Sequence, residues 1–214
     1  MTTLSVPVIV ASQTRHWRRP LCLFLFLVGV IAHGTTVVPP KFTELVGKSD
    51  YIVRAMVKAV TSELRNDGSG RHIITKVELA VIEIISGNPP QPLVLQMLGG
   101  KVGRDEMVVE GAPKFKVGDE DILFVRGNGR LLSPLFGMMY GRYPIKRDAA
   151  TGREYMTRSN GAPLVNESEV ETPLIGQASA PVSDRSYSAA VLAIAIPLSP
   201  SDFTGKIKAV LNRK

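Results

Sequence analysis

The chain has 214 residues and a formal charge of +7, with 26 lysines and arginines against 19 acidic residues. This length supports one well-buried core and excludes two ordinary domains once an N-terminal segment is set aside. One cysteine and three histidines leave little material for a disulfide framework, a zinc site or a nucleophile paired with histidine.

The first 34 residues have the layout of a secretory signal peptide. They contain three arginines and no acid, then the apolar run 21–32, then Ala32-His33-Gly34 at a suitable cleavage site. The run has 12 residues, whereas a membrane span needs about 20. We therefore expect a secreted or periplasmic protein, and the alternative is a membrane anchor formed by the uncleaved segment.

Cleavage after residue 34 would change the chemistry of the chain more than its mass. It would remove Cys22 and two histidines, so that His72 remains alone, and the formal charge would fall to +4. A chain without cysteine forms no disulfide, and a mild positive charge is no footprint of nucleic-acid binding. We expect no nucleic-acid partner, and membrane contact only through an uncleaved N-terminal segment.

Residues 35–158 predict a β-domain that opens with a short helix ending near Gly47. Three apolar side chains share one face of this helix, namely Phe42, Leu45 and Val46. Residues 51–60 predict a strand, and the residues 66–70, which tolerate positive φ, predict a hairpin turn.

The longest alternating pattern covers residues 73–85 and predicts a half-buried strand. Val77, Leu79 and Val81 are expected to be buried, and Lys76 and Glu78 to be exposed. The apolar phase changes after Ala80, and a strand changes phase through a bulge or because both of its faces become buried. Because long, bent strands close small barrels, we predict a small OB-like β-barrel.

The remaining segments complete this β-domain and add a tail. Strands are expected at residues 93–98, 106–110 and 121–126, and a hairpin at 134–158. Between them, the turn 113–120 directs Phe115 and Val117 inward. Residues 159–188, rich in small and polar residues, predict an irregular linker. Residues 189–214 form a C-terminal segment whose short helix is capped by Ser199 or Ser201. Its apolar face comprises Phe203, Ile207, Val210 and Leu211.

Few residue patterns indicate chemistry. Neither a Gly-x-Ser-x-Gly elbow nor a Ser-x-x-Lys pair occurs, and His72 beside a glycine-rich loop is typical of a solvated strand edge. The acidic run Asp119-Glu120-Asp121 lacks the ligand spacing of a calcium loop and predicts a turn before a strand. The glycines at 99–103 lack the spacing of a phosphate loop and predict a bend. We expect no enzyme activity, no cofactor and no metal site.

One segment is richer in aromatic and thioether side chains than a plain hairpin needs. Aromatic residues, methionine and arginine are enriched in protein interfaces, so the segment is a candidate partner-binding patch. The alternative is that these side chains complete the core and the neighbouring glycines allow curvature. The candidate residues are Phe136, Met138, Met139, Tyr140, Arg142 and Tyr143.

The order FTELVGKSDYIV, ITKVELAVIEIISG, LVLQMLGG, GAPKFKVGDEDILFV and FGMMYGRYPI, within residues 42–145, resembles a poorly characterised group of exported bacterial proteins. A strand that ends in a glycine turn and is followed by VGDEDILFV is similar to the OB-like barrel of the tissue inhibitors of metalloproteinases. In those inhibitors an N-terminal cysteine binds the zinc of the target. The chain after residue 34 has no cysteine, so the resemblance implies a fold and transfers no functional residue.

These observations predict a secreted or periplasmic, non-enzymatic binding module. Its partner would be a macromolecule, for example an exported protease or a component of the cell envelope. The alternative is a small hydrolase whose site uses carboxylates only, because nothing in the spacing of the 19 acids selects or excludes a catalytic pair.

Overall fold

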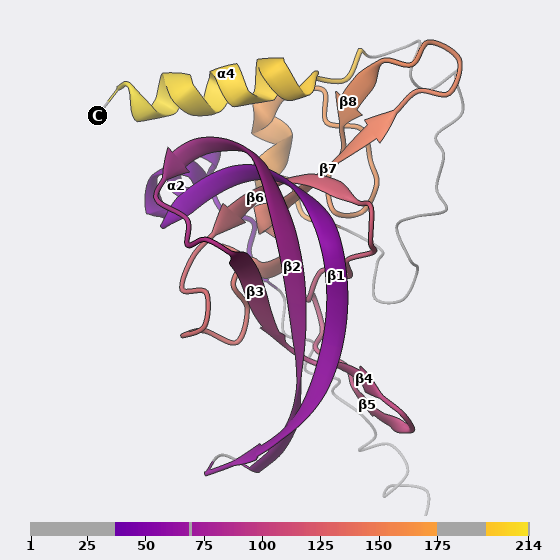
Figure 1. Ribbon diagram of the computed structural model, residues 1–214. Coiled ribbons are helices and arrows are strands. Elements are labelled where there is room, and N and C mark those ends of the chain that lie inside the picture. Colours follow the sequence, from indigo (N-terminus) through magenta and orange to yellow (C-terminus); the bar gives the residue numbers. More distant parts are fainter. Residues whose placement is uncertain (1–36, 69, 175–195, 214) are drawn as a thin grey trace, which may run out of the picture. The chain divides into compact units, whose positions relative to one another are not determined.

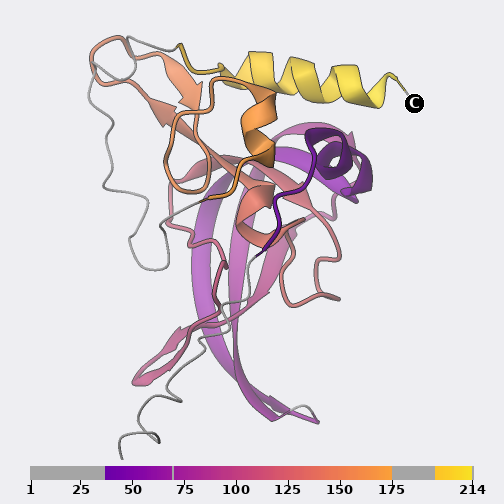
Figure 2. The same ribbon diagram turned by 180° about the vertical axis from the view of Figure 1, so that it is seen from behind.

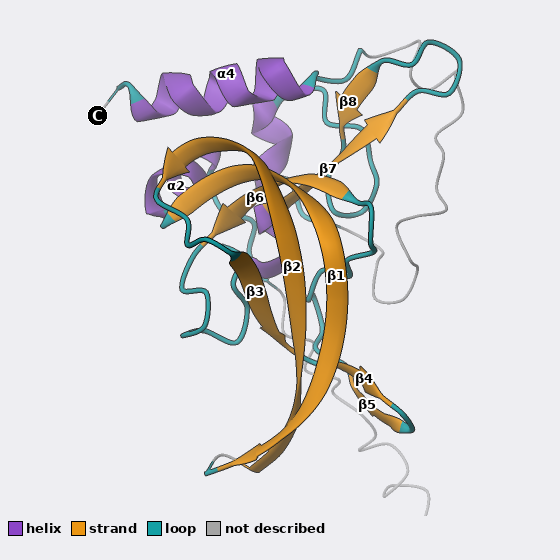
Figure 3. Cartoon of the chain, viewed as in Figure 1, coloured by secondary structure: helices purple, strands orange, loops and turns teal. Residues whose placement is uncertain are grey.

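The computed structural model describes residues 37–68, 70–174 and 196–213, and these residues form a mostly β structure with a helix near each end (Figures 1 and 3). The predicted signal peptide 1–34 and the part of the predicted linker at 175–188 lie outside the described residues. In chain order the elements are α2 Phe42–Lys48, β1 Tyr51–Asp67, β2 Gly70–Gly87, β3 Leu93–Leu98, β4 Gly100–Val102, β5 Asp105–Met107, β6 Glu120–Val125, a 3₁₀ helix Met138–Gly141, β7 Arg142–Arg147, β8 Glu154–Met156, a 3₁₀ helix Glu167–Glu171 and α4 Pro200–Leu211.

A six-stranded sheet in the order β3-β2-β1-β6-β7-β8 forms the centre of the fold. Every neighbouring pair is antiparallel. Strands β1 and β2 pair from Tyr51 and Gly87 to Asp67 and Gly70, which makes a long hairpin. Strand β6 covers β1 only up to Met56, so the far part of this hairpin projects as an arm (Figure 1). Strands β4 and β5 form a separate two-stranded sheet.

The hairpin of β1 and β2 is bent, and its register shifts three times. One shift falls between Arg54 and Ala55, where the β2 partner changes from Glu83 to Val81. This shift confirms the predicted irregularity near Ala80. Val77 and Leu79 are buried and Glu78 is exposed as predicted, whereas Val81 and Lys76 are half-buried. The exposed Ile82 and Ile84 follow the irregularity.

The prediction that the bent strands close a barrel is wrong, because the sheet remains open between β3 and β8. The outer edge of β3 is occupied by a loop and not by a strand. The side-chain amide of Asn128 accepts a hydrogen bond from the Gln96 N–H (3.1 Å) and donates one to the Val94 carbonyl (2.8 Å). The Leu98 N–H donates to the Leu132 carbonyl. An edge satisfied in this way has no need of a closing strand.

Both faces of the sheet carry a core. Neighbouring residues of β1 and β6 belong to opposite cores, because successive side chains of a strand point to opposite sides. On one face, Ile52 and Phe124 pack with Phe203 of α4. On the other face, Val53 and Leu123 belong to a cluster that includes the buried side chains of β3. Residues buried on both sides explain why β6 is almost continuously apolar.

Helices α2 and α4 cover the first of these faces (Figure 2). The predicted helix faces are confirmed: Phe42 and Phe203 lie 5.8 Å apart between ring centroids, and Tyr143 lies 5.0 Å from Phe203. Ser199 caps α4 in a capping box with Asp202. Of the helices in the described ranges, none has the length and apolar composition to cross a membrane.

Several predicted segments differ in detail. Val117 is 67% exposed, whereas its predicted inward partner Phe115 is buried. The predicted strand at 106–110 is the shorter β5, and the first hairpin arm begins only at Arg142, after a 3₁₀ turn. Residues 159–174, expected as part of the linker 159–188, pack on the domain through Leu164 and Val170, both fully buried.

Candidate functional site

The structure disperses the six residues of the predicted partner-binding patch between interior and surface. Three of them are buried, which are Tyr140, Arg142 and Tyr143. The others are half-buried, which are Phe136, Met138 and Met139. The guanidinium group of Arg126 lies 5.1 Å from the centre of the Phe136 ring. Only the half-buried residues offer surface to a partner, and Tyr143 is surrounded by core aromatic rings.

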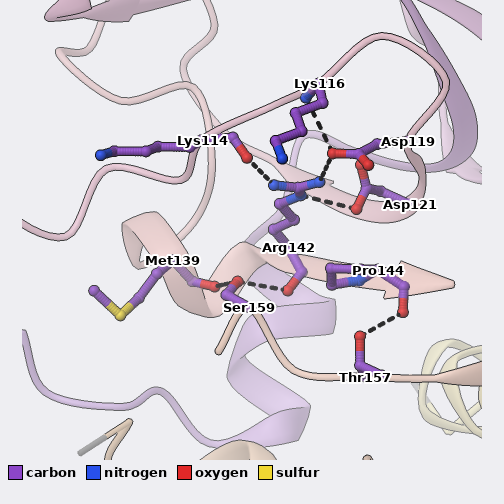
Figure 4. A network of polar contacts seen from close by, with 9 residues as sticks. All are labelled: Lys114, Lys116, Asp119, Asp121, Met139, Arg142, Pro144, Thr157 and Ser159. Carbon is purple, nitrogen blue, oxygen red and sulfur yellow. Dashed lines mark hydrogen bonds and ion pairs between the residues drawn. The ribbon is translucent and has the colours of Figure 1, made fainter. Parts of the chain in front are cut away.

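Arg142 is the centre of a buried polar cluster (Figure 4). Its Nε donates to Asp121 Oδ1 (2.8 Å), and its Nη2 donates to Asp119 Oδ2 (2.7 Å). Its Nη1 donates to the Lys114 carbonyl, and its guanidinium carbon lies 4.3 Å from the centre of the Phe115 ring. One side chain of β7 therefore joins β6 to the loop before it.

Asp121 is the more deeply buried of the two carboxylates, and it has no exposed surface. Its Oδ2 has no hydrogen-bond partner among the described residues. One arginine serves two carboxylates, so the cluster carries excess negative charge when both are ionised. Burial raises the pKa of the Asp121 carboxyl, against the opposing attraction of Arg142.

A second group of carboxylates surrounds Arg54 of β1. Its Nε donates to Glu120 Oε1 (2.5 Å), and its Nη2 donates to Glu154 Oε2 (3.0 Å). The two glutamates line a small polar cavity of about 180 Å³. Both of these acid pairs, Asp119 with Asp121 and Glu120 with Glu154, are thus bound by an arginine. Within the described ranges, no group of three or more His, Cys, Asp or Glu side chains could hold a metal ion.

His72 lies on the projecting arm of β1 and β2. Its Nε2 is 3.4 Å from Asp67 Oδ2, and its Nδ1 is 3.2 Å from the Gly70 carbonyl oxygen. The hydroxyls of Ser62 and Thr75 bond to each other and to the Gly99 carbonyl, not to His72. Among the described residues, His72 is the histidine present, and its ring contacts a carboxylate and a carbonyl.

An apolar groove of about 310 Å³ between the arm and the chain that leaves β3 has the size of a ligand site. Strands β4 and β5 and residues 108–115 form its outer wall, and the arm forms its inner wall. Ligand pockets begin at about this size and are mostly apolar with a few polar groups. The apolar side chains of the groove include Val60, Val77, Met97, Leu98, Val109 and Phe115.

Two hydroxyls and a glycine turn form the floor of the groove. Thr75 Oγ1 donates to the Gly99 carbonyl (2.7 Å) and lies 2.9 Å from Ser62 Oγ. Gly99 and Gly100 have φ of +99° and +131°, which carries the chain from β3 across the arm. A Cβ on Gly100 would lie 2.2 Å from Thr75 Oγ1 and 2.6 Å from Ser62 Oγ. Only glycine allows this close approach.

The Arg142 cluster holds the outer wall of the groove in place. Lys114 and Phe115 line the groove, and these are the residues that Arg142 contacts through a carbonyl and a ring. Arg142, which the sequence suggested as a contact residue, is therefore a positioning residue for the groove.

Local sequence patterns do not reveal this groove. The predicted bend at Gly99-Gly100 is present, whereas the strand predicted for residues 106–110 ends at Met107. In the structure, Val108 leaves the strand and is 71% exposed at the groove. The sequence signal for the groove is the adjacent pair Val108 and Val109, and two adjacent apolar residues do not indicate which surface they face.

No protein-family model matches the chain, and a search of curated proteins finds no match. The functional proposal below therefore depends on the geometry of the chain itself.

Proposed function

We propose that the chain is a secreted or periplasmic, non-enzymatic binding module that holds an apolar group of its partner in the groove. The observation that carries this proposal is the apolar cavity of about 310 Å³, whose floor hydroxyls already bond to each other and to the backbone. Such a site offers burial of apolar surface, which drives most association.

The alternative, a hydrolase that uses carboxylates only, has less support. Catalytic acid pairs require one carboxyl that donates a proton and one that stays ionised and available. In the acid pairs around Arg142 and around Arg54, one oxygen of each carboxylate binds the guanidinium group. This arrangement favours a structural role for these acids.

Binding of 1-anilinonaphthalene-8-sulfonate, a dye that becomes fluorescent in apolar sites, tests the proposal. Ala112 is half-buried and lines the groove, so Ala112→Phe should fill it and weaken dye binding at least tenfold. Ala149→Phe, in an exposed turn far along the chain, is the matched control and should bind like the wild type. Both variants share residues 1–36, so any dye binding to that segment cancels.

A second variant keeps the test valid if Ala112→Phe does not fold. Val108 is exposed at the groove, so Val108→Lys should leave stability unchanged and lower dye affinity about threefold or more. Dye affinity equal to the wild type in both variants would overturn the proposed site.

A further inference from the structure

The charges at the rim of the groove indicate that the ligand has a charged group as well as an apolar part. Lys101 and Lys114 line the groove together with one acid, Glu106. In the described part of the chain, none of these three charged groups takes part in an ion pair. The nearby Asp105 is bound to Arg71 (2.6 Å). The rim therefore carries a net charge of +1, which complements a ligand with one negative charge.

The interior of the groove favours a simple apolar chain over a peptide. A peptide carries backbone donors and acceptors that need partners when they are buried. The Thr75 hydroxyl donates to the Gly99 carbonyl, and the Ser62 hydroxyl lies 2.9 Å from Thr75 Oγ1. Apolar side chains make up most of the remaining lining, so the interior presents few free polar groups to a peptide backbone.

The volume of the groove limits the length of such a chain. At about 30 Å³ for each water-sized group, a volume of about 310 Å³ holds on the order of ten methylene-sized groups. A longer chain would extend into solvent and gain little further affinity.

We propose that the groove binds a straight-chain carboxylate of roughly ten carbons, with the chain inside and the carboxylate at the Lys101 and Lys114 rim. This inference rests on the proposed function, because it assigns a ligand class to the same groove. The site combines burial of the chain with ion pairing at the head, so the affinity depends on both parts of the ligand.

Calorimetric titration of the full chain with saturated carboxylates of increasing length tests this inference. Each added methylene should raise the affinity up to about fourfold, until the affinity levels off near ten carbons. The primary alcohol of the same length should bind at least fivefold more weakly. Affinity that rises without levelling off, or an alcohol that binds as tightly as the carboxylate, would overturn the inference.

Lysine variants locate the head group. Lys101→Gln and Lys114→Gln should each reduce the preference for carboxylate over alcohol at least twofold. Lys58→Gln, an exposed lysine of β1 that does not line the groove, is the matched control and should leave this preference unchanged. An equal preference in all three variants would contradict a carboxylate at the rim.

The outcomes separate the two proposals. If carboxylates fail to bind while a peptide with apolar and acidic residues binds and Ala112→Phe abolishes its binding, the ligand class is wrong and the groove remains the site. If carboxylates bind equally to the wild type and to Ala112→Phe, they do not occupy the groove, and the inference fails. The proposed function itself fails only if the dye also binds Ala112→Phe and Val108→Lys as tightly as it binds the wild type.

Discussion

At the scale of single residues, Arg142 connects stability to the proposed site. Its side chain is 4% exposed, and its hydrogen bonds reach two carboxylates and a carbonyl of the groove wall. A buried ion pair adds little over a hydrophobic replacement, but removal of one partner leaves an uncompensated charge. The cluster is therefore expected to be sensitive to changes in one partner and tolerant of matched changes in both.

Arg142→Met tests this expectation. The substitution leaves Asp121 buried without its cation, so the free energy of unfolding should fall by about 3–5 kcal/mol, measured by urea denaturation. Arg147→Met, which removes an arginine that is 71% exposed in its pair with Glu154, is the control and should cost less than about 1 kcal/mol.

The double variant Arg142→Met with Asp121→Asn removes the uncompensated charge as well as the cation. It should recover at least about 1 kcal/mol relative to Arg142→Met alone, because a neutral amide is easier to bury than a carboxylate. Strictly additive losses in the two single variants would contradict a charge-coupled cluster.

The pH dependence of stability gives a second test of Asp121. Burial raises its pKa in the folded state above the value of about 3.9 in the unfolded state, so between these two pKa values the folded state binds more protons. The contribution of this group to stability is therefore greatest at low pH and falls as pH rises through that window. The stability of the wild type relative to Asp121→Asn should decrease as pH rises from about 4.

Asp148→Asn provides the control of opposite sign. Hydrogen bonds from Thr151 lower the pKa of Asp148, so its contribution to stability is present above the unfolded pKa and is lost as pH falls. The stability of the wild type relative to Asp148→Asn should increase as pH rises. The same trend with pH in both variants would show that Asp121 has no raised pKa.

At the scale of elements, hydrophobic periodicity predicted most helices and strands. Phe42 and Phe203 lie on helix faces that follow the 3.6-residue period, and β3 has the bounds expected from its sequence. Residues 108–110 lie outside the strand predicted for 106–110, because alternation alone does not distinguish a paired strand from an extended wall. Val117 is exposed and not inward as predicted, because buried and exposed positions do not alternate with a fixed period in a turn.

Gly100 sets the position of β4 against the arm, and substitution should displace it. Gly100→Ala places a methyl group against Thr75 and Ser62 and also requires a φ of +131°. Gly70→Ala has a similarly positive φ (+106°) but meets open space, so it isolates the backbone strain of about 1–3 kcal/mol. Gly100→Ala should cost about 2 kcal/mol more, and hydrogen exchange in β4 and β5 should become faster. Equal losses in the two variants would show that the close approach has no energetic weight.

At the scale of the whole domain, the sequence predicted a bent sheet but not its open edges. Bulges and phase changes are visible as local patterns, and the irregularity near Ala80 was found in this way. Closure depends on what meets the edge of β3. The side chain of Asn128 meets it, 32 residues after Gln96 and 34 residues after Val94. No local pattern distinguishes an asparagine in a turn from one that seals a sheet edge.

Asn128→Ala should therefore change how the domain associates. The substitution leaves the Gln96 N–H and the Val94 carbonyl free, and an unpaired edge is a template for pairing with another chain. In sedimentation experiments, the average mass of Asn128→Ala should rise with protein concentration more steeply than that of the wild type.

Two further variants determine whether the side-chain amide itself protects the edge. Asn128→Asp keeps the acceptor for Gln96 and loses the donor to Val94, so its association should be intermediate. Asn88→Ala, in an exposed turn before β3, changes the same residue type without touching the edge and should behave like the wild type.

If Asn128→Ala sediments like Asn88→Ala at all concentrations, the edge is protected by the backbone of the loop, through the hydrogen bond between Leu98 and Leu132, and the asparagine side chain is dispensable. Association in Asn128→Ala alone would show that one side-chain amide keeps this sheet open and the domain separate from its copies.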